Sequence, residues 1–130
     1  MTAAGRRLIS SGGPWEATAS YSRAIVVGDT CWVAGTTDAG PDGSARHPDN
    51  VAAQAGAVFD IIESALVQAG FTFADIVRIR MFITDMSRAG ELMAVQAERF
   101  RDIRPAATAL VCGMVDPRIK VEIEVTARKR

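Results

Sequence analysis

The sequence predicts an α+β fold in which two helices pack on one face of a mixed β-sheet. Runs rich in β-branched residues alternate with two stretches of helical periodicity. The chain has 130 residues, of which 48% are hydrophobic, so it is long enough to bury one core. No repeat, linker or low-complexity segment divides it. We therefore expect a single domain that covers residues 1–130.

Two strands and a loop come first in the predicted order. Residues 21–27 and 30–35 are rich in β-forming side chains, and the Gly28-Asp29 pair between them suits a tight hairpin turn. These strands should therefore pair antiparallel. The segment 38–48 is dense in Gly, Pro and Asp and is predicted to be a loop.

The first predicted helix follows this loop. Asp49 or Asn50 can cap its start, and Gly70 suits its end. Its apolar positions recur every three or four residues, which is the helical period: Val51, Ala55, Val58, Ile62, Ala65 and Ala69.

A strand and a second helix come next. Within residues 76–84, Arg78 and Arg80 face one way and the alternating apolar side chains face the other, as in a strand with one buried face. That apolar face consists of Val77, Ile79, Met81 and Ile83. Asp85 or Ser87 starts the second helix, which carries Leu92, Val95 and Phe100. It should end before Pro105, because the residue before a proline disfavours helical backbone.

The last predicted strands are residues 107–112 and 119–127, joined through Asp116-Pro117. In the final strand, the apolar residues Ile119, Val121, Ile123 and Val125 alternate with Lys120, Glu122, Glu124 and Thr126. The outer face of the sheet therefore carries too much charge for a core, and something must solvate or pair it.

The charge balance argues against polyanionic partners. Fifteen basic and fifteen acidic side chains give a formal net charge of zero, so we expect neither nucleic acid nor a membrane surface as a partner. Arg99, Arg101 and Arg104 come nearest to a basic patch and are interpreted as a solvated helix end. No stretch is expected to match the ~18 apolar residues of a membrane span.

The cysteines and the single histidine suggest a reducing compartment and no metal. Cys31 and Cys112 lie in apolar stretches without CxxC spacing, so buried, reduced thiols are expected. Residues 1–7 have no apolar run behind their arginines, which favours a cytoplasmic protein. His47 lies in the predicted loop without a nearby ligand set, so neither a metal nor another cofactor is expected.

Five segments carry a family resemblance: residues 20–24 (SYSRA), 33–36 (VAGT), 82–86 (FITDM), 104–108 (RPAAT) and 121–125 (VEIEV). In order and spacing they resemble the RidA (YjgF/UK114) family of small trimeric proteins along nearly the whole chain. The resemblance implies a homotrimer, with three sheets around a threefold axis and small-molecule clefts at the subunit boundaries. It also implies an activity, because the best-known members hydrolyse reactive enamines and imines to keto acids and ammonia.

One substitution separates this chain from those members. Their motif reads Pro-Ala-Arg-Ser/Thr, and its arginine grips the substrate carboxylate, whereas here that position is Ala107. A bidentate guanidinium supplies charge and orientation that alanine lacks. Its loss should weaken binding of amino-acid-derived substrates by about tenfold or more. Arg104 is the nearest candidate replacement, but it can equally be an exposed arginine at the helix-to-strand turn.

The resemblance supplies four further candidates. Glu122 matches a glutamate that positions or activates water, Tyr21 a tyrosine near the cleft, and Gly35 a glycine whose backbone lies close to ligand. Thr108 matches the Ser/Thr after the arginine. Each also has a structural interpretation: a cross-strand ion pair for Glu122, a packed ring for Tyr21, a bulge for Gly35 and a β-branched strand residue for Thr108.

Other candidates depart from the family pattern. Trp15 can wall the cleft or fasten the N-terminus to the sheet, and Glu16 can supply a second carboxylate. Met93 stands where the family has an asparagine, and Ala109 where some members have a cysteine. The cleft is therefore expected to be more apolar than in the best-known members.

Two functional hypotheses follow. In the first, a trimeric hydrolase uses water positioned by Glu122 to attack an imine, enamine or related carbonyl derivative without the usual carboxylate recognition. In the second, a non-catalytic trimer binds a small metabolite in the same cleft. A third possibility, the 2-aminoacrylate deaminase activity of the best-known members, requires Arg104 to restore carboxylate binding.

Overall fold

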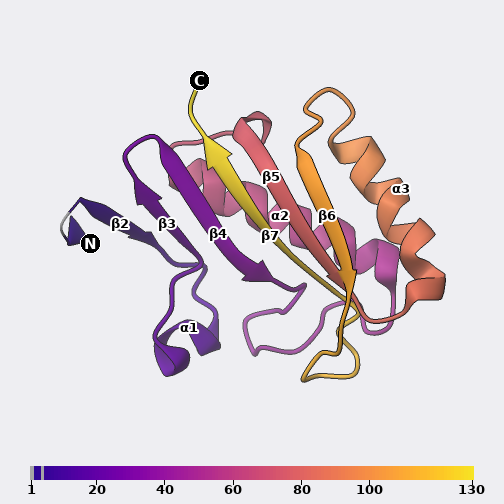
Figure 1. Ribbon diagram of the computed structural model, residues 1–130. Helices are drawn as coiled ribbons and strands as arrows, with labels where there is room; N and C mark the ends of the chain where they lie inside the picture. Colours follow the sequence, from indigo (N-terminus) through magenta and orange to yellow (C-terminus); the bar gives the residue numbers. More distant parts are fainter. Residues whose placement is uncertain (1, 4) are drawn as a thin grey trace.

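A mixed sheet with the strand order β1-β2-β3-β4-β7-β5-β6 forms the centre of the fold (Figure 1). The computed structural model describes residues 2–3 and 5–130, so Met1 and Ala4 of the predicted domain lie outside the described residues. The strands are β1 (Thr2–Ala3), β2 (Arg6–Ile9), β3 (Ala24–Val27), β4 (Thr30–Thr36), β5 (Ile76–Ile83), β6 (Ala106–Val111) and β7 (Val121–Arg128).

The two long helices cover one face of this sheet, as predicted. Helix α2 (Val51–Gln68) connects β4 to β5, and α3 (Ala89–Arg99) connects β5 to the parallel strand β6. Because β4 and β5 both run antiparallel to β7, they are parallel to each other. Both crossovers proceed in the same direction across the sheet, and right-handed crossovers then place both helices on the same face. Figure 1 shows α2 behind the sheet, with α3 beside the β6 edge.

The predicted ends of α2 are confirmed. The Asn50 side chain accepts a hydrogen bond from the Ala53 backbone N–H at 3.0 Å, and Gly70 follows the helix with a φ of +85°. The six predicted apolar positions of this helix are all buried. Helix α2 is, against expectation, long and apolar enough to meet the criteria for a membrane span. Its apolar side chains pack into the core, because Val58, Phe59 and Ile62 are fully buried.

The N-terminal segment holds elements that the pattern did not predict. Strand β2 pairs antiparallel with β3, and a short helix, α1 (Pro14–Ala19), lies between them. Strand β3 begins at Ala24, three residues later than predicted. Val77, predicted on the buried face of β5, is instead 48% exposed, because the register with β7 shifts between Ile76 and Arg78.

The opposite face of the sheet is covered by no helix in the described part of the chain. Trp32 on β4 lies there with its side chain 47% exposed. Arg80 of β5 and Glu124 of β7 lie opposite each other in register and form an ion pair at 3.2 Å. This face is therefore polar and partly aromatic, and accessible in the single chain.

Candidate functional site

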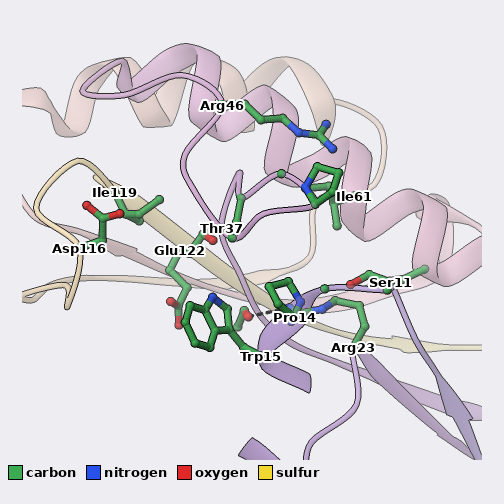
Figure 2. A pocket seen from close by; sticks show the side chains of 18 of the residues that line it. Ser11, Pro14, Trp15, Arg23, Thr37, Arg46, Ile61, Asp116, Ile119 and Glu122 are labelled. Atoms are coloured by element: carbon green, nitrogen blue, oxygen red, sulfur yellow. Dashed lines mark hydrogen bonds between the residues drawn. The ribbon is translucent and has the colours of Figure 1, made fainter. Parts of the chain in front are cut away.

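A cleft of about 680 Å³ opens at the end of the sheet where β4 finishes and β7 begins (Figure 2). Its walls come from the segment before α1, from α1 itself, from the loop after β4, from one side of α2 and from the loop between β6 and β7. The side chains that line the cleft include those of Ser11, Pro14, Trp15, Tyr21, Arg23, Arg46, Ile119 and Glu122, and Gly35 lines it with its backbone.

Glu122 projects into this cleft from β7. It is half-buried, and its carboxylate has no hydrogen-bond or ion-pair partner among residues 2–3 and 5–130. Loss of hydration raises the pKa of this carboxyl above its usual value of 4.5, and the charge of Glu124 adds to that rise while Arg23 opposes it. The cross-strand ion pair considered for Glu122 exists instead at Glu124, which bonds Arg80. Glu122 is therefore an unpaired carboxylate suited to accept a proton.

Gly35 gives Glu122 the space it occupies. A Cβ built on Gly35 would lie 3.1 Å from Glu122 Cδ and closer still to Oε2. The β4–β7 register also shifts between Val33 and Thr36, so Gly35 lies at an irregularity in the strand. The group that closely approaches Gly35 is therefore the Glu122 side chain.

Arg23 is the functional candidate that sequence reasoning missed. Its Nη1 donates to the Gly35 carbonyl at 2.7 Å and to Thr36 Oγ1 at 2.8 Å. Its Nη2 donates to the Tyr21 hydroxyl at 3.2 Å, and Nε lies 3.8 Å from Glu16 Oε2. Arg23 is only 7% exposed, so its guanidinium is a fixed part of the cleft wall. Tyr21, 39% exposed, borders the cleft beside it.

Helix α1 brings Trp15 to the cleft and turns Glu16 away from it. Trp15 is 57% exposed, and its indole lies beside Gly43 of the loop after β4 (residues 37–50, the rim loop), so it walls the cleft more than it fastens the N-terminus. Glu16 is buried, and its carboxylate accepts hydrogen bonds from the Ser11 side chain and backbone N–H. Burial alone would raise the pKa of Glu16, but the bonds from Ser11 and Ser10 and the charge of Arg23 lower it. Glu16 thus connects Ser11 and Arg23, which both belong to the wall of the cleft.

Three predicted site residues lie outside this cleft in the single chain. Ala107 is exposed on β6, where it pairs in register with Ile79. Thr108, one residue on, lies opposite Arg80. Arg104 is exposed before β6, with a φ of +54°, and its backbone N–H bonds the Phe100 carbonyl at the end of α3. The structure therefore joins Trp15, Tyr21, Gly35 and Glu122, and places Arg104, Ala107 and Thr108 at the far edge of the sheet.

The rim loop is held by a buried carboxylate. Asp38 Oδ2 accepts the His47 backbone N–H at 2.8 Å and lies 3.2 Å from His47 Nδ1. The His47 side chain is 45% exposed. No group of three or more His, Cys, Asp or Glu residues suited to a metal occurs in the described part of the chain.

The two thiols differ in burial, which corrects the prediction that both are buried. Cys31 has no exposed surface, and this burial raises the pKa of its thiol to about 11, against a small opposing effect of Arg7. Cys112 is only partly buried. Neither residue is among those that line the cleft.

Comparisons with known proteins agree with this fold. The family model described as Endoribonuclease L-PSP matches residues 13–129. The uncharacterized protein SCO2049 of Streptomyces coelicolor is 30% identical over 128 residues, which cover 98% of this chain and 95% of that protein. A RutC family protein of Sulfurisphaera tokodaii is 29% identical over 109 residues, which cover 84% of this chain and 87% of that protein.

Solved structures of similar proteins have the same fold. Rv2704 of Mycobacterium tuberculosis, described as a member of the YjgF/YER057c/UK114 family, has a TM-score of 0.86 and 40% identity, covering 95% of this chain and 99% of that one. The YjgF gene product of E. coli has a TM-score of 0.82 and 25% identity, with the same coverage of each chain.

Proposed function

The chain belongs to the Endoribonuclease L-PSP family, which includes the YjgF/YER057c/UK114 proteins, and from this premise we propose that it is a small hydrolase of imines, enamines or related carbonyl derivatives. One observation carries the proposal. Glu122 is an unpaired carboxylate with a raised pKa, held over Gly35 in a cleft with apolar walls. A base of this kind is better matched to deprotonating water near neutral pH than an ordinary glutamate is.

The proposed reaction needs only water. The Glu122 carboxylate takes a proton from water while the water oxygen bonds to the carbon of the C=N group, and it passes this proton to the nitrogen, which gives a carbinolamine. Glu122 then takes the proton of the carbinolamine hydroxyl as the C–N bond breaks and the carbonyl forms. The nitrogen keeps the bonding electrons, receives this second proton from Glu122 and leaves as ammonia or an amine.

The residue at position 107 argues against a carboxylate-bearing substrate. Alanine cannot form the paired hydrogen bonds of a guanidinium, and Arg104 lies outside the cleft of its own chain. We therefore propose that a neutral imine is hydrolysed faster than 2-aminoacrylate.

The test compares these two substrates. Purified protein is incubated with a neutral imine and, separately, with enzymatically generated 2-aminoacrylate. Faster hydrolysis of the imine is expected, with a loss of about 100-fold or more in Glu122→Gln. Glu124→Gln is the matched control, because Glu124 lies on the same strand and face but pairs with Arg80. No acceleration of either substrate, or full activity in Glu122→Gln, contradicts the proposal.

We also propose that the chain works as a homotrimer, in which a neighbouring subunit closes the cleft. The uncovered sheet face and an exposed apolar surface on β6, on α3 and on the turn before it support this. That surface includes Met86, Met93, Leu110 and Val111, which are 48–75% exposed. Light scattering at micromolar concentration should give about 42 kDa, three times the chain mass of 13.9 kDa. A mass of one chain would contradict the trimer.

Ribonuclease activity, which the family description names, is not part of the proposal. The formal net charge of zero provides no general attraction to RNA. The single histidine bonds Asp38 and is not among the cleft-lining residues. Single-stranded RNA therefore serves as a negative control in the assay. The proposed compartment is the cytoplasm, with which two unpaired thiols agree.

A non-catalytic metabolite-binding trimer is the second candidate. It is favoured by Arg23, because this charged group of the cleft wall already bonds within the fold and is not free to take part in chemistry. A metabolite at 100 times its dissociation constant should add ~2.7 kcal/mol of stability, seen as a thermal shift. Such a shift without turnover supports this candidate over the hydrolase.

A further inference from the structure

A hydrogen-bond chain in the cleft wall is not used by the proposed attack of water. Arg23 Nη1 bonds the Gly35 carbonyl and Thr36 Oγ1, and Nη2 bonds the Tyr21 hydroxyl. The guanidinium also lies 5.5 Å from the centre of the Tyr21 ring. Three hydrogen bonds and this ring contact, on a residue that is 7% exposed, leave the Arg23 side chain little freedom.

The direction of the bond between Arg23 and Tyr21 fixes the role of the phenol. Arginine has only donors, so the Tyr21 oxygen must accept from Nη2. The single proton of the hydroxyl then points away from Arg23. No acceptor for this proton is recorded among residues 2–3 and 5–130, and Tyr21 lines the cleft. The hydroxyl is thus an unused donor beside the space for a ligand.

The same bonds prevent Arg23 from taking over the role of the arginine that is missing at position 107, which is to bind the substrate carboxylate. Both N–H groups of Nη1 already donate within the fold, Nη2 donates to Tyr21, and Nε faces the Glu16 carboxylate at 3.8 Å, so neither side of the guanidinium presents a free pair of N–H groups. The unpaired charge of Glu122 in the same cleft opposes the binding of an anion, whereas the Arg46 guanidinium, which also lines the cleft, favours it.

We propose that Arg23 is a positioning residue that holds the Tyr21 hydroxyl as a hydrogen-bond donor in the cleft, so that the site recognises a neutral C=N or C=O group. This names the substrate class of the proposed hydrolase and rests on that function. The apolar walls formed by Pro14, Trp15 and Ile119 receive the body of such a molecule. The donor at Tyr21 and the base at Glu122 then act on its polar end.

The test uses a probe that binds but is not hydrolysed. Acetophenone labelled with ¹³C at the carbonyl is added to the intact protein, and the carbonyl resonance is followed by NMR. Donation from Tyr21 is expected to move the bound resonance downfield. Benzoate has the same ring with an anionic group, and we expect it to bind at least tenfold more weakly.

Variants separate the roles of the two residues. Tyr21→Phe should remove the downfield shift. Arg23→Gln should reduce it although the tyrosine remains, because the shorter, neutral amide does not reach the same partners, and Arg23→Lys should restore part of it because lysine keeps the length and the charge. Glu122→Gln should keep the shift while losing turnover, so a failure of the hydrolase and a failure of this proposal are distinguishable.

Three results would each overturn the proposal. They are the absence of saturable acetophenone binding, a downfield shift that persists unchanged in Tyr21→Phe, and tighter binding of benzoate than of acetophenone. If the benzoate preference disappeared in Arg23→Gln, Arg23 itself would be a carboxylate receptor. Because Tyr21→Phe removes only one exposed hydroxyl, the test does not depend on whether the buried Arg23 variants fold.

Discussion

The carboxylate of Glu122 lies over Gly35, on the strand next to its own, where the absence of a side chain makes room for it. The distance from a Cβ built on Gly35 to Glu122 Cδ would be 3.1 Å, which is tighter than nine in ten contacts of real Cβ atoms. The position of the candidate base thus depends on a glycine 87 residues earlier in the chain.

Gly35→Ala should displace Glu122 rather than unfold the protein. The displaced atoms are the end of a flexible side chain, and Gly35 is not among the glycines with positive φ. We expect a stability change within about 1 kcal/mol by urea denaturation and an activity as low as that of Glu122→Gln.

Gly56→Ala is the matched control, because a Cβ at Gly56 in α2 would meet nothing within 4 Å. It should stabilise the protein by roughly 0.5–1 kcal/mol and keep full activity. Wild-type activity in Gly35→Ala would show that the space over Gly35 is not needed.

Glu122→Gln should stabilise the protein in a pH-dependent way. Burial raises the pKa of Glu122 in the folded chain above 4.5, so between these values the folded state binds more protons than the unfolded state. The stability of the wild type therefore falls as pH rises through this window, whereas glutamine stays neutral. Urea denaturation should show the variant's advantage at pH 8 and its loss below about pH 4.

Glu124→Gln is the comparison for this effect. It removes an exposed ion pair with Arg80 and should cost less than about 1 kcal/mol at neutral pH. A Glu122→Gln variant that is less stable than the wild type at pH 8 would mean that the carboxylate has a partner in solution.

Gln54→Leu should be strongly destabilising. The buried Gln54 side chain donates to the carbonyls of His47 and Arg118 at 2.9 and 2.8 Å, and accepts from the N–H groups of Lys120 and Val121. Leucine fills the space but leaves these backbone groups unsatisfied. We expect a loss of about 3 kcal/mol or more in urea denaturation. Gln68→Leu, an exposed site on the same helix, should stay within about 0.5 kcal/mol.

Thiol labelling should distinguish the two cysteines. Burial raises the pKa of Cys31 to about 11 and removes it from solvent, so an aromatic disulfide reagent at pH 8 should modify Cys112 first. The second equivalent should react only after denaturation. Rapid modification of the Cys112→Ser variant would contradict the burial of Cys31.

Sequence periodicity predicted those strands and helices whose buried residues recur at regular spacing along one face. Strand β7 alternates perfectly, and its predicted inner residues are buried. Strand β2 was missed because it lies near the sheet edge, where Ile9 is its only buried residue and no alternation results. Helix α1 was missed because it has six residues and is held by contacts of Glu16 with Ser11 and Arg23.

Arg23 was overlooked for a related reason. Its partners Gly35 and Thr36 are 12 and 13 residues away, so no local pattern reveals the bonds. The hairpin offered a signal, because a tight turn at Gly28-Asp29 pairs Ala24 with Val33 and brings Arg23 beside the end of β4. Periodicity also could not show that Ala107 lies on the edge strand β6, two strands away from Glu122 on β7, since both lie in ordinary strands.

The two tryptophans lie in different parts of the molecule, so their intrinsic fluorescence can probe each part separately. Trp15 borders the cleft, whereas Trp32 stands on the uncovered sheet face, and both indoles are about half exposed. In Trp32→Phe the remaining fluorescence would report the proposed binding of a ligand in the cleft, and in Trp15→Phe it would report the proposed association of subunits through the sheet. The rates of ligand binding and of subunit association can therefore be measured separately, without attaching a fluorescent label to the protein.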